Sequence, residues 1–103
     1  MNRYDFQTSL RKVLIANKIP KALYALGEYL EGAVCLEQTS GGYVVYCGEK
    51  GEKADKKEHE KLRLACFDLI SRVIESPEEV KRIQTEFVDT FLNDVVDAGV
   101  WSK

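Results

Sequence analysis

The side chains that most often catalyse reactions or bind metals are scarce in this sequence. Among its 103 residues there is one histidine, His59, and there are three cysteines, Cys35, Cys47 and Cys66. A hydrolytic triad or a histidine-based zinc site has little to build on with a single histidine. His59 stands in a run of lysines and glutamates, which favours an exposed position at the start of a helix. We therefore expect no metal site and no hydrolytic centre.

The cysteines are odd in number, widely spaced and set in apolar segments, as buried reduced thiols usually are. Cys35 and Cys47 flank one predicted hairpin, so a thiol-redox function is an alternative. Pairing Leu36 with Val45 keeps one face of this hairpin apolar and places the two thiols on opposite faces. A slip by one residue would bring them together but would mix polar with apolar positions. We therefore predict that all three cysteines pack as free thiols and that none forms a disulfide.

The glycines predict turns and not a phosphate-binding loop. Gly41-Gly42 and the pair Gly48 and Gly51 lack the strand–loop–helix context of such a loop, and they lack its Lys-Ser/Thr pair. Together with the lone histidine, this pattern predicts a protein that is not an enzyme. It predicts no catalytic residue, no cofactor and no metal.

The elements that must position these residues are those of an α+β fold. Helical periodicity alternates with short runs of β-forming residues on either side of the turn at 39–42. Ser76, Pro77 and Glu79 form a helix-start signal. Residues 21–30 fit a helical turn as well, but we favour a short strand or an irregular segment there. The predicted elements are a helix at 3–17, strands at 33–37 and 43–47, a charged loop at 48–53 that could extend into a third strand, and helices at 56–74 and 77–97.

This order predicts a small antiparallel sheet with a central hairpin and as many as three or four short strands. A lone hairpin is marginal in water, so the N-terminal helix and the two C-terminal helices should pack on one face of it. The length suits a single domain spanning residues 1–103.

The charge balance is mildly acidic, with a net charge of −2 and an isoelectric point near 5.4. Nucleic-acid binding normally requires a basic surface, so we expect no nucleic-acid partner. No run approaches the ~18 consecutive apolar residues of a membrane span, and the N-terminus has no apolar signal core. We therefore expect a cytoplasmic protein without a membrane partner.

Carboxylates and tyrosines concentrate in the middle of the chain. Tyrosine is enriched at protein interfaces, and carboxylates attract a basic partner. The last helix offers a second acidic surface, with Glu86, Asp89, Asp94 and Asp97. We favour the first region narrowly because it combines both residue types with glycine-bearing loops. The residues predicted there to contact a partner are Glu28, Tyr29, Glu31, Tyr46, Glu49 and Glu52.

Residues 24–74 resemble a known family. Gly27-Glu28-Tyr29-Leu30-Glu31-Gly32-Ala33-Val34-Cys35-Leu36-Glu37 is followed by Gly42-Tyr43-Val44-Val45-Tyr46, by Gly48-Glu49-Lys50-Gly51, and by a helix carrying Ala65-Cys66. This succession resembles the small immunity proteins of polymorphic-toxin and contact-dependent growth inhibition systems. Tyr43 stands where a tryptophan is common in them, and Lys50 where an arginine is common. The resemblance implies a cytosolic antidote that binds and blocks one toxin domain, often a nuclease, without catalysis.

Three hypotheses follow. The first is a toxin-neutralising binding protein, and the second is a small enzyme or thiol-redox protein using Cys35 and Cys47. The third is a self-associating regulatory or structural subunit. We favour the first hypothesis, because the candidate chemistry is sparse and the acidic, tyrosine-bearing region suits a basic protein partner.

Overall fold

The central hairpin forms in the register that its apolar alternation predicts. The computed structural model describes the backbone of residues 6–97 and the side chains of residues 8–92. Leu36 in β2 (Val34–Thr39) lies opposite Val45 in β3 (Gly42–Glu49), and both side chains are buried in the main core. Cys35 lies on the other face of β2, in a separate small cluster. The prediction that Cys35 and Cys47 point to opposite faces is therefore confirmed.

The sheet has four strands in the order β1-β2-β3-β4. β4 (Glu52–His59) is antiparallel to β3, as β3 is to β2. β1 (Tyr24–Leu26) follows a 3-10 turn, η1 (Lys21–Leu23), and runs parallel to β2. The expected short strand within residues 21–30 is thus confirmed, but the sheet is mixed, and the prediction of a purely antiparallel sheet is wrong.

β4 forms the third strand into which the sequence allows the charged loop at 48–53 to extend, but it continues through residues 56–59, where the sequence predicts the start of a helix. The helix in question, α2 (Leu62–Val73), begins six residues later than the predicted start at residue 56. Strand propensity depends strongly on context, and the free edge of β3 gives this charged segment a partner for its backbone groups. His59 ends β4 and is half-buried, so its predicted exposed position at a helix start is wrong.

The two outer helices follow their predicted patterns. α1 (Phe6–Ala16) buries Leu10, Val13 and Leu14; residues 3–5 of the predicted helix lie outside the described residues. α3 (Pro77–Asp97) has the predicted bounds. The hydroxyl of Ser76 accepts a hydrogen bond from the backbone N–H of Glu79 at 3.4 Å, which confirms the predicted cap.

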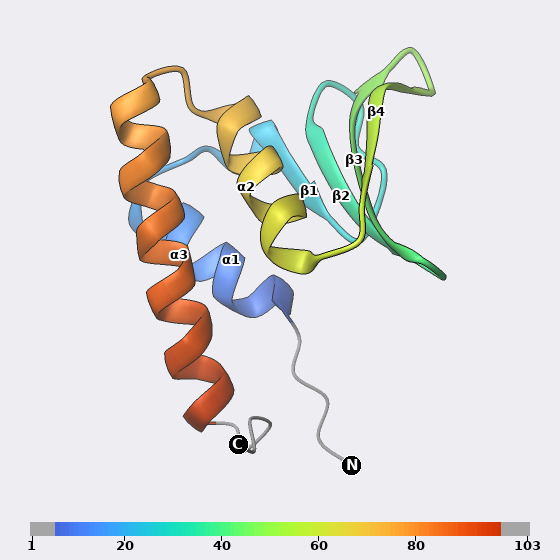
Figure 1. Cartoon of the computed structure of the whole chain (residues 1–103). Helices are drawn as coiled ribbons and strands as arrows, with labels where there is room; N and C mark the ends of the chain where they lie inside the picture. The colour runs from blue at the N-terminus through green and yellow to red at the C-terminus, as the bar shows by residue number, and fades with distance from the viewer. Residues whose placement is uncertain (1–5, 98–103) are drawn as a thin grey trace.

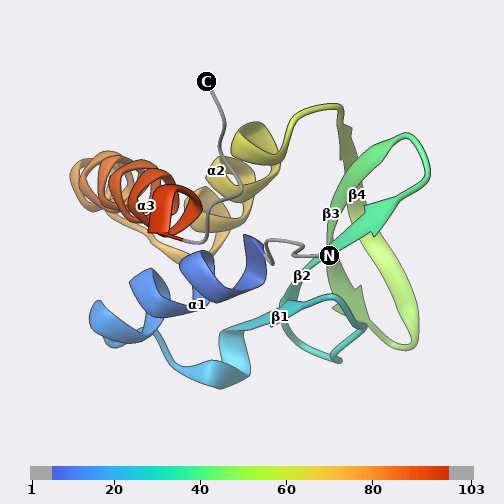
Figure 2. The same cartoon turned by 90° about the horizontal axis from the view of Figure 1, so that it is seen from below.

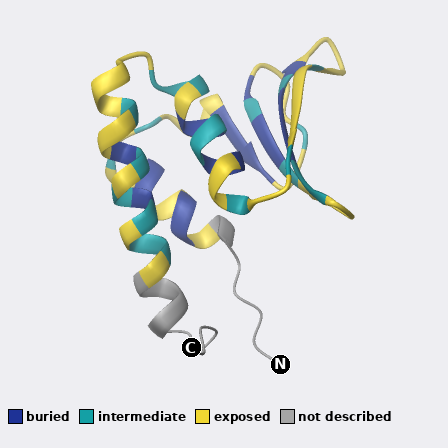
Figure 3. Ribbon diagram, in the orientation of Figure 1, coloured by how far each residue is buried: buried dark blue, intermediate teal, exposed yellow. Residues whose placement is uncertain are grey.

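The helices all lie on one face of the sheet (Figure 1). α2 packs against β2, β3 and β4, while α3 packs on α1 and α2 and forms the layer furthest from the sheet, as the view from below shows (Figure 2). Buried residues line the sides that face one another, and β4 is mostly exposed (Figure 3). The predicted α+β class is confirmed. The core contains Leu10, Val13, Leu14, Tyr24, Leu26, Leu36, Val45, Ala65, Cys66, Leu69, Ile70, Ile83 and Phe87.

Candidate functional site

The sheet face turned away from the helices, here called the outer face, is covered by residues 27–33, the crossover loop. Adjacent parallel strands cannot be joined by a tight turn, so the connection from β1 to β2 must cross one face of the sheet. The Gly32 N–H donates to the Gly48 carbonyl at 2.8 Å, and the Gly48 N–H donates to the Ala33 carbonyl at 2.9 Å. The crossover loop is therefore fixed to β3 through its backbone.

A small apolar cluster lies between the crossover loop and the sheet. The ring of Tyr29, in the loop, stacks on the ring of Tyr46, in β3, with centroids 6.2 Å apart and planes 20° apart. The Leu30 N–H lies 3.4 Å from the Cys35 sulfur, which is fully buried. The cluster consists of Ala25, Cys35, Val44 and Tyr46, with Tyr29 packed against them.

Glu31 joins the crossover loop to the tip of the β3–β4 hairpin. Its carboxylate accepts hydrogen bonds from the Tyr29 hydroxyl at 2.6 Å, from the Lys50 N–H at 2.6 Å and from the Gly51 N–H at 3.0 Å. The Tyr29 hydroxyl and then the two backbone donors hold the pKa of Glu31 below its ordinary value. The hydrogen bond between Tyr29 and Glu31 also raises the pKa of Tyr29. Glu31 is exposed, but its carboxylate is already bonded to groups of this chain and acts as an anchor.

Tyr46 is fully buried, although the sequence places it among the residues that contact a partner. Its hydroxyl donates to the carboxylate of Glu37, and the Lys53 ammonium lies 5.0 Å from its ring centroid. Burial, and then the bond to Glu37, raises the pKa of Tyr46. Tyr46 therefore supports the crossover loop from beneath. While the loop covers it, a partner can contact Tyr29 but not Tyr46.

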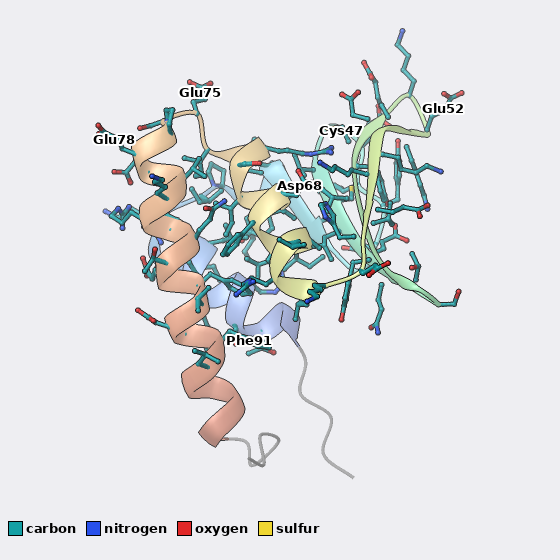
Figure 4. The ribbon with its side chains drawn as sticks, in the orientation of Figure 1. Cys47, Glu52, Asp68, Glu75, Glu78 and Phe91 are labelled. Carbon is teal, nitrogen blue, oxygen red and sulfur yellow. The ribbon has the colours of Figure 1, made fainter. Side chains whose placement is uncertain are left out.

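Glu49 and Glu52 end β3 and begin β4, and they lie directly opposite one another. The turn between them has φ of 53° at Lys50 and 79° at Gly51, the positive pair that a two-residue hairpin turn prefers. Both glutamates are exposed, as is Glu28 in the crossover loop, and none of these three side chains bonds to a described residue. Figure 4 shows Glu52 at the hairpin tip, on the side of the molecule away from α3.

The structure therefore divides the six predicted contact residues into two groups. Glu28, Glu49 and Glu52 are open to a partner, whereas Tyr29, Glu31 and Tyr46 hold the crossover loop and the hairpin tip in place.

The second predicted surface, on α3, is less open. Glu86 already accepts a hydrogen bond from Asn17 at 3.2 Å and lies 3.5 Å from Arg82, while Asp89 is exposed. Asp94 and Asp97 lie outside the residues whose side chains are described.

A polar cluster on the inner face joins β4 to α2, and the sequence reasoning missed it. His59 Nε2 lies 2.8 Å from Asp68 Oδ2, and Arg72 Nε donates to Asp68 Oδ1 at 2.9 Å. Arg72 also lies 3.7 Å from the sulfur of half-buried Cys47. The i, i+4 spacing of Asp68 and Arg72 is the one signal visible in the sequence. Burial opposes the charge of Arg72, but its bonds to Asp68 outweigh this and raise its pKa.

This cluster stabilises the contact of the β4 edge with α2. In the part of the chain that the structure describes, no group of three or more His, Cys, Asp or Glu side chains could hold a metal ion. Residues 6–97 also contain no helix that is both long enough and apolar enough to cross a lipid bilayer.

Comparison with protein-family models, with curated proteins and with solved structures finds no match for this chain.

Proposed function

We propose that this chain is an immunity protein that binds a cognate toxin domain in the cytoplasm and blocks its active site. The target that fits best is a nuclease such as an RNase, because a nuclease cleft carries lysine and arginine to attract phosphates. The resemblance of residues 24–74 to immunity proteins supports this proposal. In this function the protein is a ligand and performs no chemistry.

The observation that carries the proposal is the juxtaposition of Glu49 and Glu52. Like charges directly opposite one another across a strand pair are destabilising. Here two exposed carboxylates share a hairpin tip, and among residues 8–92 no basic side chain bonds to either. An arginine or lysine of a partner would remove the repulsion and gain a charge-assisted hydrogen bond, bidentate in the case of arginine.

The geometry around this pair supports binding without rearrangement. The positive φ pair at Lys50 and Gly51 fixes the turn, and Glu31 holds the N–H groups of both residues. A partner therefore meets a hairpin tip that is already ordered, which lowers the entropic cost of association.

The net charge of this region also favours a basic partner. The crossover loop and the hairpin tip carry four carboxylates, Glu28, Glu31, Glu49 and Glu52, against two ammonium groups, Lys50 and Lys53. Complementary charge speeds association, which is valuable when free toxin is already damaging the cell.

The test uses a candidate toxin domain, taken from a neighbouring reading frame that encodes one. Binding of that domain is measured by calorimetry, and protection by growth of cells that express it. Reversing both charges, Glu49→Lys with Glu52→Lys, should weaken binding by about tenfold or more and abolish protection, since two attractive contacts become repulsive. The association rate of the natural chain should fall as salt is added.

A matched control applies the same change of charge elsewhere. Glu60 and Glu75 are exposed, lie in the loops before and after α2, and bond to no described residue. Glu60→Lys with Glu75→Lys should leave binding within about twofold, apart from the small effect of net charge on the association rate. Equal losses in the two double variants would refute the hairpin site, and loss in Asp89→Lys alone would assign binding to α3. No binding to the neighbouring domain would refute the function.

A further inference from the structure

β4 is an edge strand, and within residues 6–97 no strand lies on its second side. It spans eight residues, lies at the end of the sheet order and is exposed along most of its length. An edge strand presents a row of backbone donors and acceptors on which another strand can pair. The charge pattern along β4 indicates which strand that is.

We propose that β4 pairs antiparallel with β4 of a second copy of this chain, so that Lys53 of each copy lies opposite Glu58 of the other. Glu52 then lies opposite His59, and Ala54 opposite Lys57. Opposite charges facing each other across a strand pair are stabilising, and the two-fold axis forms each of these pairs twice.

Neighbouring registers do not give this complementarity. A slip by one residue in one direction places Glu52 opposite Glu58 and Lys53 opposite Lys57. A slip by one in the other direction places Asp55 opposite Lys57, but it sets Lys56 opposite itself on the axis and leaves Glu58 opposite Ala54. The pattern therefore selects one register and disfavours the adjacent ones, as a specific interface requires.

A bulge in β4 makes this register compatible with the backbone. Val45 lies opposite Lys57 and Cys47 opposite Ala54, so Tyr46 alone faces both intervening residues, Asp55 and Lys56. In a regular strand Lys53 and Glu58, five positions apart, would point to opposite faces.

The extra residue places both on the outer face. Lys53 lies over the outer-face ring of Tyr46, and Glu58 lies opposite Val44, a member of the outer cluster. When two copies run antiparallel, the side chains of one half of β4 therefore point to the same faces as those of the half that pairs with it. The bulge, with φ of 51° at Asp55, falls on the axis between them.

Such a pairing joins two four-stranded sheets into one sheet of eight strands. The paired segment is short, so the interface falls at or below the size of a standard stable complex. We therefore expect a dimer that dissociates on dilution in the micromolar range and that does not extend further through β4, because the two-fold pairing uses the β4 edge of both copies. This inference concerns the chain alone and does not depend on the proposed toxin.

Sedimentation velocity of the full chain, from about 1 μM to about 1 mM, tests the pairing. The natural chain should pass from monomer to dimer. Glu58→Lys, which sets lysine against Lys53, should weaken dimerisation by about tenfold, and so should Lys53→Glu. The double variant, Lys53→Glu with Glu58→Lys, restores opposite charges and should dimerise again. Far-UV circular dichroism monitors the fold of each variant.

Glu60→Lys is the matched control, because Glu60 is exposed just beyond β4 and takes no part in the pairing. It should dimerise as the natural chain does. A chain that stays monomeric over the whole range overturns the proposal. So does a dimer weakened equally by Glu58→Lys and Glu60→Lys, or one that the double variant fails to restore. Because Glu52 belongs to both surfaces, toxin binding is measured at concentrations where the chain is monomeric.

Discussion

The two faces of the sheet are held by different kinds of contact. On the inner face, α1, α2 and α3 bury a continuous apolar core of large side chains such as Leu69 and Phe87. On the outer face, the crossover loop covers a cluster of four buried residues and is fixed mainly by hydrogen bonds through Gly48 and Glu31.

The difference separates the stability of the fold from the ordering of the candidate binding surface. Apolar burial dominates folding free energy, so the inner face decides whether the chain folds. The crossover loop buries little apolar surface and is held in part by solvent-exposed hydrogen bonds. It can therefore open while the core stays intact. Of the carboxylates of the proposed toxin site, Glu28 lies in the crossover loop, and Glu49 and Glu52 lie at the hairpin tip that Glu31 fixes to this loop.

Truncation of a core side chain gives the largest expected effect. Leu69 in α2 is fully buried, so Leu69→Ala should lower the free energy of unfolding by about 2–5 kcal/mol. The matched control is Leu64→Ala in the same helix, where the side chain is 44% exposed and the change should stay within about 0.5 kcal/mol. Urea unfolding measures both variants. Similar losses at the two positions would show that the inner face is not the dominant core.

A methyl group added under the crossover loop should have an intermediate effect. A Cβ at Gly48 would lie 2.3 Å from the Leu30 carbonyl oxygen and 3.2 Å from the Tyr29 ring, so Gly48→Ala must displace the loop. We expect a loss of about 1–3 kcal/mol, together with weaker binding of the toxin domain.

Gly41→Ala is the control for this variant, because a Cβ there meets no atom within 4 Å. It should leave unfolding and binding nearly unchanged. If Gly48→Ala is as stable as Gly41→Ala and binds as well, close packing of the loop on β3 does not order the surface.

The inner half of the fold could be predicted from the sequence because its signals are local. The alternation through Leu36 and Val45 determines the hairpin register, and Ser76 begins α3 at the predicted point. The sequence allows a third strand after the hairpin, but the extent of β4 could not be predicted in this way, since its charged residues form a strand only because β3 provides an edge. The parallel pairing of β1 also depends on tertiary contacts, in which Tyr24 and Leu26 join the main core.

The candidate site was predicted in composition but not in the roles of its residues. The grouping of tyrosines and carboxylates is visible in the sequence. That Tyr46 lies beneath Tyr29, and that Glu31 anchors the hairpin tip, depends on a loop whose path follows from the parallel connection. The His59–Asp68 contact was missed for a related reason, because it requires β4.

Titration of Glu31 sharpens the comparison through a smaller and more local effect. The pKa of Glu31 in the folded protein lies below the ordinary value of 4.5. The stability that its carboxylate gives to the crossover loop is therefore complete above pH 4.5 and is lost as the pH falls through the folded pKa. The Lys50 and Gly51 amide signals in NMR spectra should therefore shift with a midpoint below 4.5.

In Glu31→Gln this shift should disappear, and the two amides should exchange faster with solvent at neutral pH. Glu28→Gln, which changes a neighbouring carboxylate with no bond to a described residue, should preserve the titration. A midpoint at or above 4.5 would mean that Glu31 does not anchor the tip in solution.

The cysteines allow the two faces to be compared in the natural chain without any substitution. Cys47 is half-buried, Cys35 lies under the crossover loop, and Cys66 lies in the main core, where burial raises the pKa of its thiol. A thiol reagent under native conditions should therefore modify Cys47 first, Cys35 at the rate at which the loop opens, and Cys66 only on global unfolding.

Mass spectrometry of peptides after timed labelling measures the three rates. Low concentrations of urea should steeply accelerate the modification of Cys66, because global unfolding exposes much surface. They should accelerate the modification of Cys35 only weakly, because loop opening exposes little surface. Gly48→Ala should accelerate modification of Cys35 more than that of Cys66, because it disturbs the loop directly in addition to lowering the free energy of unfolding. If Cys35 and Cys66 react at one rate with the same urea dependence, both faces open only together. The crossover loop then has no motion independent of global unfolding.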